Sequence, residues 1–399
     1  MKNGSEVTAV GYQTSPSLPG GTLVINATDT VWIDHSSINA SGLPGGSAGS
    51  ISITAGDAVR LTHSEIRADG STISVPPQPG HGGNIVIDAG KTFVSEASTV
   101  SAHSKMFNGG NVIIQASERI RIDDGLVNTS AGGDGGSGNI SLQAGNSVRL
   151  LNGAVLNADN TQSGHAGRIV LDAGGNVVVD GSRLTVEATR GESGQIQVSA
   201  DDSVRLVNGT VVSANNLRQG PAGQIVVDAG GIALVDGSLV TAEPIEGQPG
   251  QIHINAGDAV RVVDGSRITV NNNGVGNAGI LTVEAGTSVV GENSTFVAQT
   301  GEGHGGTVQI TAPDRVRLTN SIVSTGVGGS PASVGGTIEI TSETVRVENG
   351  RVVSNASNGS GGTVTIKSNA FRPDAASVVE AESLGGGGVD GTVSIQPLP

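Results

Sequence analysis

Histidine and acidic side chains are the residues of this chain whose chemistry could serve catalysis or metal binding. The histidines are scattered, with no two of them four residues apart, and the chain has no cysteine to share a metal with them. Their spacing therefore favours ordinary exposed side chains. They are His35, His63, His81, His103, His165, His253 and His304.

Acidic turns could hold a cation loosely. The segment 131–136, Ala-Gly-Gly-Asp-Gly-Gly, is similar to one turn of the calcium-binding nonapeptide repeat, but it occurs once and out of pattern. The pairs Asp123-Asp124 and Asp201-Asp202 fall in expected turns, where a solvated surface is the simpler interpretation. We therefore predict no metal site and no cofactor.

Carbohydrate processing is the catalytic function to weigh against a non-catalytic role, because some polysaccharide lyases and glycosidases have a parallel β-helix fold. A glycosidase needs two carboxylates about 5 to 9.5 Å apart across the substrate. The carboxylates expected on strands occupy one position of a sequence repeat, and they occur at least two repeats apart. They therefore form a sparse row and no cleft. Aromatic residues, which sugar-binding platforms usually need, make up only 2% of the chain and are dispersed; Trp32 is expected to be a cap or surface residue. We predict that the protein is not an enzyme.

A repeat of roughly 28 residues runs along the chain and must position all of these residues. It contains Gly-x-Ile-x-Ile-x-Ala or a close variant, first seen at 21–27, and Ser342 and Ser368 continue the series. The repeat alanines are Ala27, Ala55, Ala89, Ala116, Ala144, Ala173, Ala200, Ala229, Ala256, Ala285 and Ala312. Such a period is typical of a solenoid.

Each repeat contains three short runs in which apolar and polar residues alternate, as in 195–199, 203–206 and 210–214. Alternation with a period of two predicts strands with one buried face. Asn-Gly or Asp-Gly pairs between the second and third runs, such as Asn208-Gly209 and Asp264-Gly265, accept the positive φ of a sharp corner. Stacking equivalent runs in parallel explains why each run matches its counterpart in the next repeat, which antiparallel hairpins do not.

We therefore predict an all-β fold, a single-stranded right-handed parallel β-helix of about 13 coils with three short strands per coil. Residues 1–20 are expected to be a lead-in or cap, 21–396 the β-helix, and 397–399 an end that continues into a longer parent protein. The third corner varies in length, for example at 72–80 and 326–335, where a solenoid tolerates insertions and often binds ligands.

Two outward positions of the repeat carry complementary charges. The residue before the repeat alanine is acidic in some coils, the centre of the second run is arginine in others, and no coil carries both. We hypothesise that the arginines reach across the corner to a carboxylate of an adjacent coil, against the alternative of two merely solvated faces. The acidic residues are Asp88, Asp172, Asp228 and Glu284, and the arginines are Arg60, Arg121, Arg149, Arg205, Arg261, Arg317, Arg346 and Arg372.

The composition limits the classes of partner that we expect for this protein. There are 36 acidic residues against 21 basic ones, and the resulting net charge of −15 repels nucleic acid, so we expect no nucleic-acid partner. No apolar stretch follows Lys2 as in a signal peptide, and no segment approaches 18 consecutive apolar residues.

The repeated unit resembles that of filamentous-haemagglutinin-type exoproteins of two-partner secretion systems. The resemblance rests on Gly-Asn-Ile-Ser-Leu-Gln-Ala-Gly at 138–145 with Ser-Val-Arg-Leu-Leu-Asn-Gly-Ala at 147–154, and it covers nearly the whole chain. The segments 377–381 and 388–395 are similar to the closing coils of such proteins. The amino-terminal secretion domain of the family is not evident in residues 1–20, so the chain resembles the carboxy-terminal repeat region alone.

The resemblance implies a non-catalytic adhesin or haemagglutinin-like stalk, extracellular or at the surface of a Gram-negative outer membrane. It also implies export through an outer-membrane transporter. Expected partners are a host, neighbouring-cell or matrix surface, including its glycans. A carbohydrate-processing β-helix and a structural filament unit that associates end to end remain the alternatives.

Overall fold

The structure is a computed structural model, and the residues that it describes form strands joined by turns and loops. The described residues are 1–10, 19–42, 46–70, 80–385 and 388–398, and no helix occurs among them. The chain divides into two units, unit 1 (Met1–Ala200) and unit 2 (Asp201–Pro399). Most of the predicted corner loop at 72–80, part of the predicted lead-in, and Pro399 lie outside the described residues.

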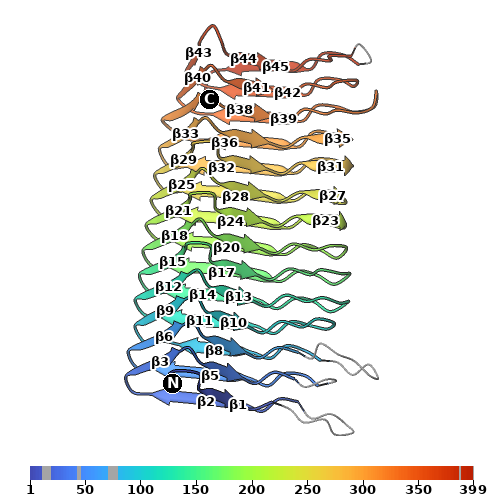
Figure 1. The fold of residues 1–399 in the computed structure, drawn as a ribbon. Coiled ribbons are helices and arrows are strands. Elements are labelled where there is room, and N and C mark those ends of the chain that lie inside the picture. The colour runs from blue at the N-terminus through green and yellow to red at the C-terminus, as the bar shows by residue number, and fades with distance from the viewer. Residues whose placement is uncertain (11–18, 43–45, 71–79, 386–387, 399) are drawn as a thin grey trace. The chain divides into compact units, whose positions relative to one another are not determined.

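Each unit is a right-handed parallel β-solenoid, which confirms the predicted fold class (Figure 1). Every coil contributes one strand to each of three parallel sheets, and the two units together hold about 13 turns of about 28 residues. We call the sheets 1, 2 and 3 in the order in which the chain enters them within a repeat. All pairings within these sheets are parallel, as stacked equivalent runs require.

The strands of unit 1 follow the three predicted runs of each repeat. Sheet 1 contains β2 (Leu23–Ala27), β5 (Ile51–Ala55), β8 (Ile85–Asp88), β11 (Val112–Ala116), β14 (Ile140–Ala144), β17 (Arg168–Ala173) and β20 (Gln195–Ala200). Sheet 2 contains β3 (Thr30–Asp34), β6 (Ala58–Thr62), β9 (Thr92–Glu96), β12 (Arg119–Asp123), β15 (Ser147–Leu151) and β18 (Asn176–Asp180). Sheet 3 contains β1 (Glu6–Thr8), β4 (Ser37–Asn39), β7 (Glu65–Arg67), β10 (Thr99–Ser101), β13 (Leu126–Asn128), β16 (Val155–Asn157) and β19 (Arg183–Thr185).

Unit 2 repeats this arrangement. Its sheet 1 contains β24 (Gln224–Ala229), β28 (Gln251–Ala256), β32 (Ile280–Ala285), β36 (Thr307–Thr311), β39 (Thr337–Thr341), β42 (Thr363–Lys367) and β45 (Thr392–Gln396). Its sheet 2 contains β21 (Ser203–Val207), β25 (Ile232–Asp236), β29 (Ala259–Val263), β33 (Ser288–Glu292), β37 (Arg315–Thr319), β40 (Thr344–Glu348) and β43 (Ala370–Pro373). Its sheet 3 contains β22 (Val211–Ser213), β26 (Leu239–Thr241), β30 (Arg267–Thr269), β34 (Thr295–Val297), β38 (Ile322–Ser324), β41 (Arg351–Val353) and β44 (Val378–Glu380).

The core consists of aliphatic columns that run from coil to coil. Along β14, buried Ile140 and Leu142 alternate with Ser141, which faces outward. The parallel register places Ile140 against Ile169 and Leu142 against Leu171 of the next coil. Because each buried side chain meets a similar one above and below it, small aliphatic residues fill the interior without a large aromatic core.

Two phenylalanines lie inside these columns, one in each unit, and both are fully buried. In unit 2, Phe296 of β34 occupies a position that Ile268 and Val323 hold in the neighbouring coils. Gly291 stands where those coils have Val262 and Leu318, and a Cβ on it would lie 3.1 Å from a ring carbon of Phe296. The missing side chain therefore makes room for the ring.

The corner between sheets 2 and 3 adopts the left-handed backbone that the Asn-Gly and Asp-Gly pairs predicted. The φ angles of Asn208 and Asp264 are 56° and 53°. Asparagines at this corner also form a ladder in unit 2, where Asn320 donates to Asn293 and Asn349 donates to Asn320 at 3.1 and 2.9 Å. The corner residues thus satisfy both the turn geometry and the stacking.

The third corner projects beyond the three sheets. In unit 2 it forms two small parallel pairs, β23 (Asn216–Gln219) with β27 (Pro244–Glu246), and β31 (Asn272–Val275) with β35 (Thr300–Glu302). We call this projection of unit 2 the fin. Asn272 is buried inside it and donates to the backbone oxygens of residues 247 and 277. Buried amides such as this one therefore satisfy backbone groups inside the fin.

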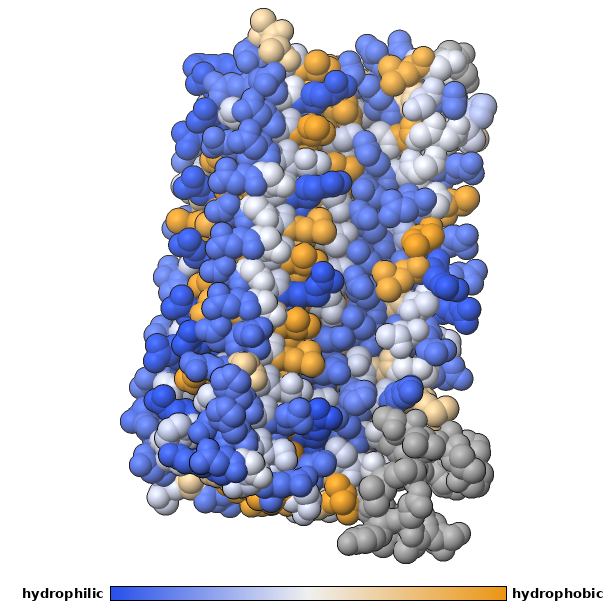
Figure 2. Space-filling model, in the orientation of Figure 1, coloured by the Kyte–Doolittle hydropathy of each residue, from blue (hydrophilic) through white to orange (hydrophobic). Residues whose placement is uncertain are grey.

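Polar residues cover most of the face in Figure 2, and the hydrophobic residues on it lie in narrow rows. Such rows are expected of a solenoid, because an outward position keeps its place from coil to coil within each unit. Within the described residues there is no helix of the length and hydropathy needed to cross a bilayer.

Candidate functional site

The predicted repeat alanines are corner residues that build the solenoid. Each ends a strand of sheet 1 or, for Ala89 and Ala312, directly follows one, and nearly all are buried. Ala144 pairs with Ala173 in unit 1, and Ala256 pairs with Ala285 in unit 2, so the alanines of neighbouring coils lie one over the other. The adjacent glycine is equally constrained, because a Cβ on Gly145 would lie 2.1 Å from the backbone oxygen of Ser117.

The predicted arginines face outward along the centre of sheet 2, and the carboxylate partners of Arg121, Arg317 and Arg346 lie in the same sheet. Arg317 approaches Glu348 of the next coil at 2.9 Å, and Arg346 approaches the same carboxylate at 2.6 Å. The hydrogen bond from Arg317 holds the pKa of Glu348 below its usual range. Arg121 likewise pairs with Glu96 of the preceding coil and with Asp123.

The predicted carboxylate positions lie on sheet 1 and are not the partners in these ion pairs. Asp88 and Asp172 instead border a shallow hollow of about 300 Å³ in unit 1, with Gln115 and Gln143 between them. In unit 2, Asp228 and Glu284 lie on either side of Asn255. Arg121 and Arg317 therefore pair with carboxylates within sheet 2 and not with carboxylates across the corner. Outward side chains of two sheets diverge at a corner, whereas those of neighbouring coils in one sheet run side by side.

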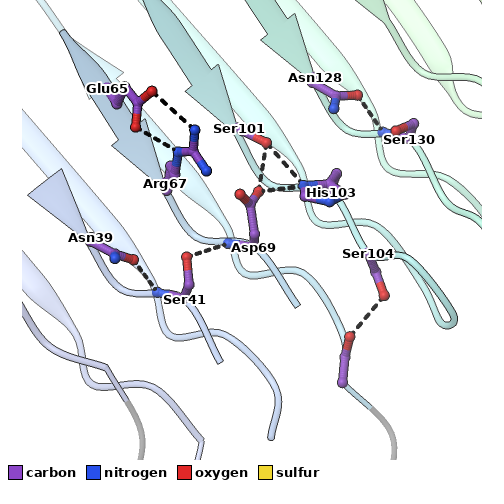
Figure 3. A network of polar contacts seen from close by, with 11 residues as sticks. Asn39, Ser41, Glu65, Arg67, Asp69, Ser101, His103, Ser104, Asn128 and Ser130 are labelled. Carbon is purple, nitrogen blue, oxygen red and sulfur yellow. Dashed lines mark hydrogen bonds and ion pairs between the residues drawn. The ribbon is translucent and has the colours of Figure 1, made fainter. Parts of the chain in front are cut away.

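A serine, a histidine and an aspartate meet in unit 1 beside sheet 3 (Figure 3). Ser101 donates to Oδ1 of Asp69 at 2.5 Å, and Nδ1 of His103 lies 2.9 Å from the same oxygen. The hydroxyl of Ser101 is 3.3 Å from that same ring nitrogen. A nucleophilic serine must contact the ring nitrogen opposite to the one that the aspartate holds. This cluster therefore lacks the geometry of a catalytic triad.

The cluster is one case of a structural motif that recurs in both units. The backbone N–H of His103 donates to Asp69 of the preceding coil at 3.0 Å. Asp159 accepts from Glu187 in the same way, and Asn215, Asn271 and Asn355 accept from the residues at 243, 299 and 382. An Asp or Asn two residues beyond a sheet 3 strand thus supplies an oxygen to the next coil.

Asp159 is the member of this motif with a strongly shifted pKa. Burial raises the pKa of its carboxyl to about 6, against hydrogen bonds from the backbone of Glu187 and the hydroxyl of Thr185 that favour the charged form. The nearby charge of Glu187 raises the pKa further. An amide would make the same backbone contact without this electrostatic cost, as Asn215 does in unit 2.

The remaining sequence candidates do not form metal sites. Across the described residues there is no group of three or more histidine, cysteine or acidic side chains placed to hold a metal ion. His35 and His63 stack on one another with ring centroids 4.8 Å apart. Asp123 accepts from Asn152 of the next coil, and Trp32 lies under Lys2 at 4.0 Å on the surface of β3. Contacts within and between neighbouring coils account for these side chains.

A concave surface lies on the outer side of sheet 3 in unit 2, and we call it the unit-2 groove. It consists of two hollows of about 480 and 460 Å³ that share Asn271 and Asn273. Its floor is the last residue of four of the sheet 3 strands, which faces outward yet is buried. These floor residues are Thr241, Thr269, Ser324 and Val353.

Amide side chains dominate the wall of the groove. Asn271 accepts the backbone N–H of Gln299 at 2.8 Å, so its amide nitrogen remains available to a ligand. Gln299 donates to Ser324 at 2.7 Å, which leaves its carbonyl oxygen available. Asn273 donates to Glu243 at 3.2 Å. The protein thus orients each amide through one group and presents the other to the groove.

The groove is electrically balanced although the protein is acidic. Of the described residues that line the two hollows, Glu243 is the one carboxylate and Arg267 the one cation, and none is aromatic. No family model, no curated protein and no solved structure matches this chain. The function must therefore be inferred from these side chains themselves.

The sequence-based prediction missed the groove and the corner motif. One signal for them is a double repeat of 56 residues, because Asn215 and Asn271 are separated by that interval, as are Glu243, Gln299 and Asn355. A search at twice the coil length would have found these polar positions. The depth of the groove could not be found in this way, since it depends on the fin.

Proposed function

We propose that this protein is a non-catalytic, extracellular surface protein of the filamentous-haemagglutinin type, an adhesin or stalk that contacts cell surfaces or matrix. The observation that carries the proposal is the unit-2 groove, an open polar surface to which several successive coils contribute. Equivalent contacts from successive coils suit an extended ligand, because many weak contacts along one molecule add up to useful avidity.

Two features support a non-catalytic role over carbohydrate processing. A glycosidase needs a pair of carboxylates about 5 to 9.5 Å apart, and Glu243 has no second carboxylate among the described residues that line the groove. The Ser101, His103 and Asp69 cluster of unit 1 places both partners on one ring nitrogen, so the aspartate does not orient the histidine through the opposite nitrogen as a catalytic triad requires.

The same proposal places the protein outside the cell, at the outer membrane of a Gram-negative bacterium, with an outer-membrane transporter of the two-partner type as its export partner. The support is the resemblance of the repeats and the parallel solenoid of each unit. Secretion of the chain, fused to the amino-terminal secretion domain of such a system, in cells with and without the transporter tests this part.

A structural filament unit is the second candidate. Val393 and Ile395 of β45 continue the buried columns of Val364 and Ile366, yet they are 41% and 53% exposed. A second copy of the chain stacked on β45 would cover these side chains. Sedimentation at increasing protein concentration tests this candidate. Stacking predicts species heavier than the monomer, and Val393→Lys should abolish those heavier species.

Attachment of whole cells to the immobilised protein tests the proposed function. We expect saturable attachment to host or neighbouring cells that soluble glycans reduce, while heat-unfolded protein serves as the control. Polysaccharides incubated with the protein should release no new reducing ends and no unsaturated products. Release of either product, in proportion to protein concentration, would establish the carbohydrate-processing alternative instead.

A further inference from the structure

The unit-2 groove repeats its chemistry along the direction in which the coils stack. Neighbouring strands of a sheet lie about 4.8 Å apart, so every second coil repeats after about 10 Å. Asn215 and Asn271 are two coils apart on the groove wall, and Glu243 and Gln299, also two coils apart, occupy the coils that follow each of them. The wall therefore alternates between two kinds of polar position, with a period of two coils.

These positions offer complementary hydrogen-bonding groups. The amide nitrogen of Asn271 and the carbonyl oxygen of Gln299 have no hydrogen-bond partner in the parts of the chain that the structure describes. Thr269 and Ser324 add hydroxyls at the floor between them. A ligand that satisfies this wall must offer both donors and acceptors at short, regular intervals, as sugar hydroxyls do.

The charge of the groove restricts the class of sugar. Glu243 and Arg267 balance one another on the lining, whereas the whole chain carries a net charge of −15. An acidic polysaccharide would meet the repulsive field of the protein without a row of cations in the groove to offset it. A basic polymer would find one carboxylate. An uncharged polymer meets neither obstacle.

We propose that the unit-2 groove binds a linear, uncharged polysaccharide that lies along the coil direction, with about one sugar opposite each coil. The inference rests on the proposed function and names the ligand class for it. Extended β-linked glycans advance by a distance similar to the coil spacing and turn over with every second sugar, which matches the two-coil period of the wall. Without an aromatic platform each sugar contributes little, so affinity depends on the number of sugars bound.

Substitutions that other coils already contain provide a test that preserves the fold. Asn271→Asp keeps the oxygen that accepts the Gln299 N–H, as Asp69 and Asp159 do at equivalent positions, but it removes the amide donor and adds a charge. Gln299→Glu copies Glu187 and Glu243; it keeps an acceptor oxygen but removes the amide donor to Ser324 that orients the side chain, and it adds a charge. Asn255→Ala is the matched control, because Asn255 belongs to the same coil as Asn271 and lies on sheet 1.

The experiment is a calorimetric titration of the full chain with cello-oligosaccharides and xylo-oligosaccharides of two to eight sugars, and with oligogalacturonates of the same lengths. We expect affinity for at least one neutral series to rise with length, to fall about tenfold or more in Asn271→Asp and in Gln299→Glu, and to stay unchanged in Asn255→Ala. Tighter binding of the acidic series, no binding of either neutral series, or full affinity in both groove variants would overturn the proposal.

The same variants separate this inference from the proposed function. Cell attachment that survives in Asn271→Asp and Gln299→Glu would refute the groove as the ligand site while leaving an adhesive role intact. Absence of attachment by the unsubstituted protein would refute the adhesive role itself, whatever the oligosaccharide titration gives.

Discussion

At the scale of single residues, the structure depends on polar side chains that replace backbone partners at the corners. Asp69, Asp159, Asn215, Asn271 and Asn355 each accept a backbone N–H from the following coil. A buried or half-buried N–H without a partner would cost about 1 to 3 kcal/mol. The motif therefore fixes the loops of the third corner onto one another.

The pKa of Asp159, raised to about 6, predicts that this carboxylate destabilises unit 1 at neutral pH. The folded protein binds the proton more tightly than the unfolded chain does, so the free energy of unfolding falls as pH rises from about 4 to about 6. Asp159→Asn should remove this loss. The variant should match the unsubstituted protein near pH 4 and exceed its free energy of unfolding by about 1 to 3 kcal/mol at pH 7.5, measured by urea unfolding.

Asp172→Asn, at a solvent-exposed position of sheet 1, is the matched control for the loss of one negative charge. If the difference in stability between Asp159→Asn and the unsubstituted protein stayed constant between pH 4 and pH 7.5, the assigned effect of burial on Asp159 would be wrong.

Residue types predicted some local features and not others. The Asn-Gly and Asp-Gly pairs predicted the positive φ at the corner between sheets 2 and 3, because this backbone angle depends on the residues of the turn itself. The partner of Arg317 was not predicted, because Glu348 ends the sheet 2 strand of the next coil while the position chosen from the pattern lies on sheet 1. A position along the repeat does not reveal which outward side chains run side by side.

At the scale of elements, alternating apolar residues predicted nearly every strand of the three sheets. The reason is that each strand has one buried face, and the register is fixed by columns such as Ile140 over Ile169. The fin strands were not predicted, because their pairing depends on buried amides such as Asn272 and on loop length. The groove depends on the fin, so it also required the structure.

Gly291 and Phe296 test whether a column is packed as a unit. Phe296→Val alone should leave a cavity beside Gly291 and lower the free energy of unfolding by about 2 to 4 kcal/mol. Gly291→Leu alone should crowd the ring and also destabilise the protein. The double variant restores the side chains that the neighbouring coils contain, so its loss should be clearly smaller than the sum of the two single losses, as measured by denaturant unfolding.

The double variant Val289→Ala with Phe296→Val is the control, because both of its substituted side chains become smaller and neither becomes larger. Losses of the Gly291→Leu and Phe296→Val double variant that are additive, or larger than additive, would show that the glycine does not accommodate the ring.

At the scale of the whole molecule, an acidic chain with few aromatics forms its proposed binding surface from repeated coils. Each unit repeats small aliphatic residues inside and polar residues outside, and unit 2 adds a fin that turns an outward sheet face into a groove. The net charge of −15 disfavours polyanionic partners, and the balanced lining of the groove favours an uncharged one. The composition alone predicted that nucleic acid is not a partner, but it could not locate the groove.

The fold and the groove both require that equivalent positions of successive coils lie directly over one another. Disulfide formation tests this directly, because the chain contains no cysteine of its own. Gln115 and Gln143 are in register on sheet 1, whereas Ser141 on the same face is offset by two residues, which separates its Cα from that of Gln115 by about 8 Å. We predict that Gln115→Cys with Gln143→Cys forms a disulfide under mild oxidation, as seen by mass spectrometry, and that Gln115→Cys with Ser141→Cys does not, because Cα atoms more than about 7 Å apart cannot be bridged. Equal or preferential cross-linking of the offset pair would contradict the stacked register.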